Sequence, residues 1–218
     1  MREFIIGVVS SLAATTVTVI GGWFGLSWPK RFAIRLLSRL TGTGIVRVYP
    51  QQKIANAALA ADLRKARWVR VLAPRGNELT RDSFQALWQG EAEHVESVQV
   101  LLPDPADTGG WLRAREEDLR GTDPGFEPGL LAKQVSANVD YLNAIAARNP
   151  MVALRLFDAP HTCRVIATDR VAYFTLFTGR GHGRNSPCLV VASDGIMYEH
   201  ALALFAQLWR AAYSDSAA

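Results

Sequence analysis

Two periods of apolar residues run along this chain, and together they predict a domain in which strands and helices alternate. From residue 152 to 157 apolar residues recur at every second position, which is the pattern of a strand. Two more apolar runs, at about 162–167 and 171–177, are separated by the polar pair Asp169-Arg170. We therefore expect an antiparallel hairpin there. Other predicted strands are 45–49, 68–73, 98–102 and 188–192.

Longer stretches carry apolar residues three or four positions apart, and these predict the helices. The predicted helices are 51–66, 80–89, 111–120, 130–148 and 196–212. In the first of them we expect Ile54, Ala58, Ala61 and Leu63 to face inward. Because strands alternate with helices before a hairpin intervenes, we expect an α/β fold, with a mixed β-sheet flanked by helices on both faces.

The N-terminal residues have a different pattern, since no charged residue occurs from Phe4 to Pro29. A helix of that length crosses a hydrocarbon core of about 30 Å. Trp23 and Trp28 stand near its end, where interfacial aromatics are found. We expect residues 1–29 to form a transmembrane anchor, and a cleaved signal peptide is the alternative.

Basic residues follow this span and predict its orientation. Lys30, Arg31, Arg35 and Arg39 come directly after it, whereas only Arg2 precedes it. The positive-inside rule then places residues 45–218 in the cytoplasm, behind a single-pass span in the inner membrane. We expect residues 30–44 to form a basic juxtamembrane helix with a Gly/Thr linker. This helix either lies at the lipid headgroups or is an ordinary solvated helix.

Small residues four positions apart within the span, Gly21 and Gly25, favour close helix packing and hence a homo-oligomer. The alternative is that glycine is merely common in membrane helices.

Composition changes this picture little. The chain has 218 residues, a formal net charge of +4 and a pI near 9.3, which permits an anionic partner without requiring one. Its two cysteines form no framework, and no pair of its four histidines has the helical spacing of metal ligands. We therefore expect no metal site and no cofactor.

The predicted hairpin carries the one recognisable chemical motif. Arg164 and Asp169 have the Lys-to-Asp spacing of the motif His-x-Lys-x4-Asp, whereas Thr162 occupies the histidine position and His161 lies one residue earlier. Aligning His161 instead puts Cys163 on the lysine. The segment thus resembles a degenerate motif of the phospholipase D superfamily. The order of elements from about Lys53 onward also resembles one half-domain of that family.

The resemblance implies chemistry for particular residues. In the family the histidine is the nucleophile and the lysine binds phosphate, so it implies phosphate binding by Arg164. With it we group the basic residues of the neighbouring loops as candidate ligand-binding residues: Arg75, His161, Arg180 and Arg184. A structural role for Arg164, paired with Asp169 or Asp158, is the alternative, because a buried charge needs a partner.

Two functions from different classes follow. One is a membrane-anchored, non-catalytic regulatory or sensor module that binds a phosphate-bearing ligand, such as a nucleotide, a nucleic-acid end or a lipid headgroup, or a partner protein. The other is a phosphodiesterase or nuclease that works as a dimer, with His161 and Asp169 as catalytic residues. Asp169 is otherwise an ordinary hairpin-turn residue, and a plain oligomerisation scaffold is a third hypothesis.

Overall fold

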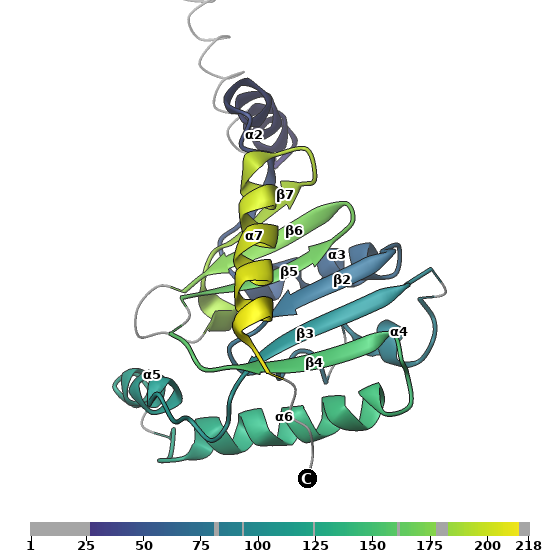
Figure 1. Cartoon of the computed structure of the whole chain (residues 1–218). Coiled ribbons are helices and arrows are strands. Elements are labelled where there is room, and N and C mark those ends of the chain that lie inside the picture. Colours follow the sequence, from purple (N-terminus) through teal and green to yellow (C-terminus); the bar gives the residue numbers. More distant parts are fainter. Residues whose placement is uncertain are drawn as a thin grey trace, which may run out of the picture.

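One mixed sheet of seven strands forms the centre of the protein (Figure 1). The computed structural model describes residues 27–80, 83–92, 94–123, 125–160, 162–177 and 183–213. The strands are β1 (Ile45–Tyr49), β2 (Trp68–Leu72), β3 (Ser97–Pro103), β4 (Val152–Phe157), β5 (Cys163–Thr168), β6 (Val171–Leu176) and β7 (Cys188–Ala192). Their order across the sheet is β1-β7-β6-β5-β2-β3-β4. Strands β2, β3 and β4 run parallel, and all other neighbours pair antiparallel.

Helices cover both faces of the sheet, as the sequence predicts (Figure 1). They are α2 (Ser27–Thr41), α3 (Gln52–Leu63), α4 (Gln85–Trp88), α5 (Trp111–Arg120), α6 (Leu130–Ala146) and α7 (Ile196–Ala211), with a short 3-10 helix, η1 (Gly183–Asn185). Helix α7 packs on one face through Tyr198, Ala201 and Phe205. Helices α3 and α6 bury Leu59 and Val135 on the other face. The fold is therefore a three-layer α/β arrangement with a core on each side of the sheet.

The hairpin β5–β6 is confirmed, and it lies in the middle of the sheet. The preceding strand β4 does not join it, because β4 pairs with β3 at the far edge. At this edge, Leu156 of β4 also forms a short antiparallel bridge with Tyr213, which follows α7 in the chain. The central position of β5 makes every side chain on it buried, including that of Arg164.

Two helix predictions are wrong in detail. Where a helix over 80–89 is predicted, the described residues 80 and 83–89 contain only α4, a single turn. In α3 the buried face consists of Ala55, Leu59 and Leu63, whereas Ile54 is 53% exposed. The stretch is rich in alanine, so its apolar pattern is nearly uniform around the helix and cannot select the inward face.

The predicted anchor, residues 1–29, lies outside the described residues apart from the first turn of α2. Within the part of the chain that the structure describes, no helix combines the length and the apolar character needed to span a membrane.

Backbone hydrogen bonds attach the end of α2 to the domain, in the segment where the sequence indicates a linker. The carbonyl oxygens of Gly42, Thr43 and Gly44 accept hydrogen bonds from the backbone N–H groups of Ile196, Met197 and Ala192. Gly44 has a φ of +77° and packs backbone to backbone against Gly195. This contact leaves no room for a Cβ atom at Gly195, so α2 and the start of α7 are held together.

We predict that Gly195→Ala destabilises the protein by about 1–3 kcal/mol, because the added methyl collides with the Gly44 backbone, which cannot move away as a flexible side chain would. The control is Gly121→Ala at a helical φ of −62°, where a new Cβ meets nothing closer than 3.4 Å. Denaturant unfolding of both variants gives the comparison. Equal stability would mean that the two backbones are not in tight contact.

Candidate functional site

A cavity of about 580 Å³ opens between the sheet, α3, α5 and the loops that follow β2 and β6. Its described lining includes five cationic side chains, Lys53, Arg75, Arg115, Arg164 and Arg184. Two carboxylates, Glu78 and Asp123, also line it. The cavity is therefore positively charged, and it brings together three of the residues that the sequence predicts as ligand-binding.

Arg164 lies among the deeply buried lining residues of the cavity. It sits on β5 opposite Thr175 of β6, and Thr175 sits opposite Cys188 of β7. Directly opposed residues of antiparallel strands share a face, so these three side chains form one row across the sheet. The Arg164 side chain is 7% exposed. Burial lowers the pKa of its guanidinium to about 10, which is still well above neutral pH, so the group stays protonated.

The partner of Arg164 is Glu78. Its carboxylate forms an ion pair with Arg164 Nη1, and Thr175 Oγ1 lies 3.5 Å from Nη2. The expected partners are elsewhere: Asp158 accepts a hydrogen bond from Thr108 at 2.6 Å, and Asp169 lies at the other end of β5. The prediction that a buried Arg164 needs a carboxylate thus holds, but the predicted identity of that carboxylate is wrong.

A second buried side chain positions Glu78. The amide of Gln52, at the start of α3, donates to the other carboxylate oxygen of Glu78 at 2.6 Å and to Asn56 Oδ1 at 2.9 Å. Gln52 is 2% exposed. Both oxygens of the Glu78 carboxylate are therefore engaged, while Arg164 Nε has no hydrogen-bond partner.

The loop that carries Glu78 is itself fixed from α6. The Asn138 side-chain amide donates to the carbonyl of Arg75 and to Asn77 Oδ1, both at 2.7 Å. Gly76 adopts a φ of +84° with Leu102 directly behind it, which a larger residue would not tolerate. This geometry turns the backbone sharply after β2 and places Arg75 and Glu78 on the cavity wall.

Three arginines from separate elements converge near the mouth of the cavity: Arg75 after β2, Arg115 on α5 and Arg184 on η1. The Arg75 guanidinium lies over the ring of Phe126, with 5.3 Å between its central carbon and the ring centroid. Burial lowers the pKa of Arg75, and the charges of Arg115 and Arg184 lower it further. The last effect places Arg115 and Arg184 within electrostatic reach of Arg75.

Helix α5 is held so that Arg115 lines the cavity. The buried carboxylate of Glu116 accepts hydrogen bonds from the backbone N–H groups of Gly129 and Leu131 at 2.7 and 2.9 Å, at the start of α6. These bonds satisfy N–H groups that a helix leaves free at its first turn. Arg115 also lies 3.7 Å from Asp118 in an ion pair on the same helix.

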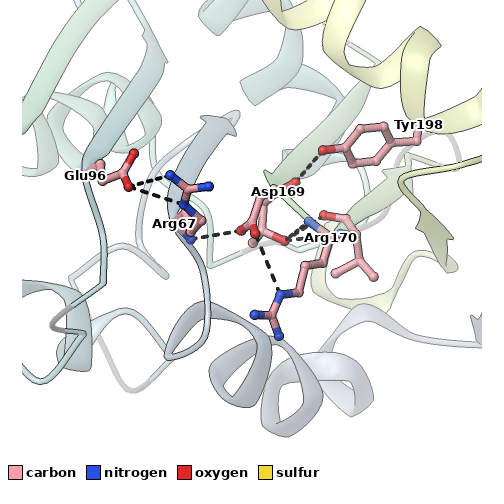
Figure 2. A network of polar contacts seen from close by, with 7 residues as sticks. Arg67, Glu96, Asp169, Arg170 and Tyr198 are labelled. Carbon is pink, nitrogen blue, oxygen red and sulfur yellow. Dashed lines mark hydrogen bonds and ion pairs between the residues drawn. The ribbon is translucent and has the colours of Figure 1, made fainter.

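Asp169 lies away from this cavity, in the turn between β5 and β6 (Figure 2). Its carboxylate accepts the backbone N–H of Arg67 at 2.9 Å and lies 3.7 Å from Arg170 Nε. Asp169 is five positions after Arg164 along nearly extended chain, roughly 16 Å at the rise of a strand. The structure therefore gives Asp169 contacts of a turn residue, and its catalytic role remains a prediction.

Polar contacts around Asp169 connect the hairpin turn to neighbouring elements (Figure 2). The Tyr198 hydroxyl donates to the carbonyl of Thr168 at 2.5 Å, and burial together with the nearby Asp169 raises the pKa of Tyr198 to about 12. Arg67 pairs with Glu96 at 2.8 Å on the surface. This network joins α7, β5 and the start of β2.

Two predicted site residues, His161 and Arg180, lie outside the described residues. Sequence reasoning missed Glu78, Gln52, Lys53 and Arg115, which come from separate loops and helices. One signal pointed to Glu78: a central-strand arginine requires a carboxylate, and Glu78 follows the neighbouring strand. Among the described residues, no group of three or more His, Cys, Asp or Glu side chains is placed to hold a metal ion.

Comparisons with known proteins give similarities of structure. No family model and no curated protein matches the sequence. TrmBL2, described as an archaeal chromatin protein with a novel mode of DNA binding, has a TM-score of 0.48 and 12% identity, over 95% of this chain and 69% of its own. Nuc from Salmonella typhimurium, a phospholipase D family member, has a TM-score of 0.45 and 16% identity over 73% and 90%. NucT from Helicobacter pylori has a TM-score of 0.45 and 10% identity over 77% and 96%. At these values we take the function from the side chains of this chain alone.

We predict that Glu78→Gln destabilises the protein by about 1.5–3 kcal/mol, since it leaves the buried Arg164 charge without its carboxylate. The matched control is Glu96→Gln, which breaks an arginine–glutamate pair whose side chains are 65% and 63% exposed. Its Tm should stay within error of the wild type.

The double variant Glu78→Gln/Arg164→Met provides the second arm. It removes the buried charge as well as its partner, so it should recover part of the lost stability. If Glu78→Gln unfolds at the wild-type denaturant concentration, the ion pair does not stabilise the fold.

Proposed function

We propose that this chain is a non-catalytic binding module whose cavity holds a phosphate-bearing ligand. The observation that carries the proposal is the convergence of Arg75, Arg115 and Arg184 near the mouth of one cavity. Guanidinium groups bind phosphate through paired N–H donors and remain charged. The charges of Arg115 and Arg184 act on Arg75, and a bound phosphate would offset that unfavourable interaction.

The charges of the cavity divide into two groups. Deep inside, the Arg164 charge is balanced by Glu78, and Gln52 fixes that carboxylate. Farther out, Arg75 contacts an aromatic ring and Arg184 is exposed on η1, while Arg115 pairs with Asp118 and the carboxylate of Asp123 also lines the cavity. In this proposal the anion binds mainly to Arg75, Arg115 and Arg184. Arg164, to which the family resemblance assigns phosphate binding, has only a secondary role in holding the anion.

Binding is favoured over hydrolysis by the side chains that line the cavity. Covalent phosphoryl chemistry needs a nucleophile beside a base. Among the described lining residues there is no histidine or cysteine, and the Ser83 hydroxyl donates to the Asn56 carbonyl at 3.4 Å. Thr162 stands where the phospholipase D motif has its nucleophile. These features support a regulatory or sensor module. We also propose that the module is located at the inner membrane, with residues 45–218 in the cytoplasm, and that it self-associates.

We predict that Arg75→Ala weakens binding of inorganic pyrophosphate by about tenfold to a hundredfold, because a hydrogen bond to a charged group contributes about 1.5–3 kcal/mol. Isothermal titration of the purified full chain measures this. The control is Arg170→Ala, which removes an exposed arginine beside Asp169 and away from the cavity. It should leave the pyrophosphate affinity unchanged.

Two results would contradict the proposal. One is equal loss of affinity in both variants, which would indicate general surface attraction. The other is hydrolysis of a generic phosphodiester or phospholipid by the wild type that His161→Ala abolishes while the fold stays intact. That outcome would make the protein a phosphodiesterase.

A further inference from the structure

We propose that α2 is a membrane-surface helix whose outer face lies in the headgroup region of an anionic lipid bilayer. The proposal concerns a surface remote from the cavity lining and does not depend on the cavity's ligand. It rests on the exposure of particular α2 side chains, on their charges, on the sequence that leads into the helix and on the way α2 is attached.

The outer face of α2 carries a row of large apolar side chains in solvent. Phe32, Leu36 and Leu40 are four residues apart and are 54%, 50% and 77% exposed. Ser38, on the opposite side of the helix, is 7% exposed and faces the domain. Residues four apart lie above one another on a helix, so the three apolar side chains form one continuous stripe pointing away from the protein.

Basic side chains run beside this stripe. Arg35 and Arg39 are both exposed, and each precedes a residue of the stripe by one position. No acidic residue occurs between Glu3 and Asp62, whereas six basic residues do. An apolar stripe edged by arginines matches an interfacial helix, in which the stripe enters the headgroup boundary and the cations meet anionic lipid heads.

The sequence leading into α2 identifies a bilayer as the occupant rather than a second copy of the chain. Residues 4–29 contain no charged side chain and run directly into the basic part of α2. A symmetric pair of α2 helices would bring like charges together with no carboxylate on either helix to balance them. An anionic surface satisfies both the stripe and the charges.

The attachment of α2 fixes how this face is presented. Backbone hydrogen bonds from Ile196, Met197 and Ala192 to residues 42–44 hold the end of the helix, and the backbones of Gly44 and Gly195 pack directly against each other. Helix α2 sits at one end of the molecule, beyond β7 and the start of α7 (Figure 1). The domain would therefore sit on the bilayer in one orientation.

The test uses the full chain reconstituted in vesicles, with a polarity-sensitive fluorophore on Leu36→Cys or on Val48→Cys. Val48 is a matched control, because it is an apolar residue of the neighbouring strand β1 and is 47% exposed, close to the 50% of Leu36. Native Cys163 and Cys188 are buried, and labelling of the wild type gives the background. Vesicles contain phosphatidylcholine with or without phosphatidylglycerol, and iodide quenches fluorophores that remain in water.

With phosphatidylglycerol present, quenching at position 36 should fall by about threefold, since an interfacial helix buries its apolar face ~5–10 Å into the boundary. Position 48 should stay quenched, and Arg35→Glu/Arg39→Glu should abolish the shielding at position 36. Equal quenching at both positions would overturn the proposal. So would shielding at position 36 that is equally strong without phosphatidylglycerol, because the arginines would then not be meeting anionic lipid heads.

Discussion

The ion pair between Arg164 and Glu78 is the constraint on which the site depends. A guanidinium on the central strand of a seven-stranded sheet is nearly removed from water, and such a charge is costly without a partner. The partner comes from a loop that Asn138 and Gly76 hold in shape, and Gln52 binds the same carboxylate. The pair thus links β5, the loop after β2 and the start of α3 around one cavity.

This arrangement separates two kinds of charge. The Arg164 charge is balanced within the protein by Glu78, whereas Arg75 lies within electrostatic reach of two further arginines that line the same cavity, Arg115 and Arg184. The same division explains why a motif that resembles the phospholipase D signature need not imply its chemistry: here an arginine with a carboxylate partner stands where the family has a phosphate-binding lysine. At the other end of the protein, α2 presents an apolar and basic face of its own, so ligand binding and membrane contact are spatially separate in our account.

Much of the fold could be predicted from the sequence because its signals are local. The period-two pattern at 152–157 and the short apolar runs elsewhere located the seven described strands within a residue, and the polar pair at 169–170 located the central hairpin. The inward face of α3 could not be predicted, since alanine on all sides gives no contrast. The predicted length of the helix at 80–89 was also wrong, because among its described residues only the turn 85–88 is helical, with Phe84 fully buried before it.

The site was predictable in part for the same reason. Arg164, Arg75 and Arg184 were named because each lies beside a recognisable local feature, a motif or a glycine-containing loop. Glu78, Gln52 and Arg115 were missed because their roles depend on which loops meet in three dimensions. Sequence spacing also suggested Asp169 as a partner of Arg164, but an extended strand carries residues five positions apart to opposite ends of the sheet.

The most direct measurement is a crystal structure of the protein soaked with tungstate, a heavy-atom analogue of phosphate. Anomalous difference density between the guanidinium groups of Arg75 and Arg184, with the Arg164–Glu78 pair still intact, is the result that this account predicts. Density located instead at Arg164, with Glu78 displaced, or no density in the cavity while surface arginines such as Arg170 are occupied, would contradict it.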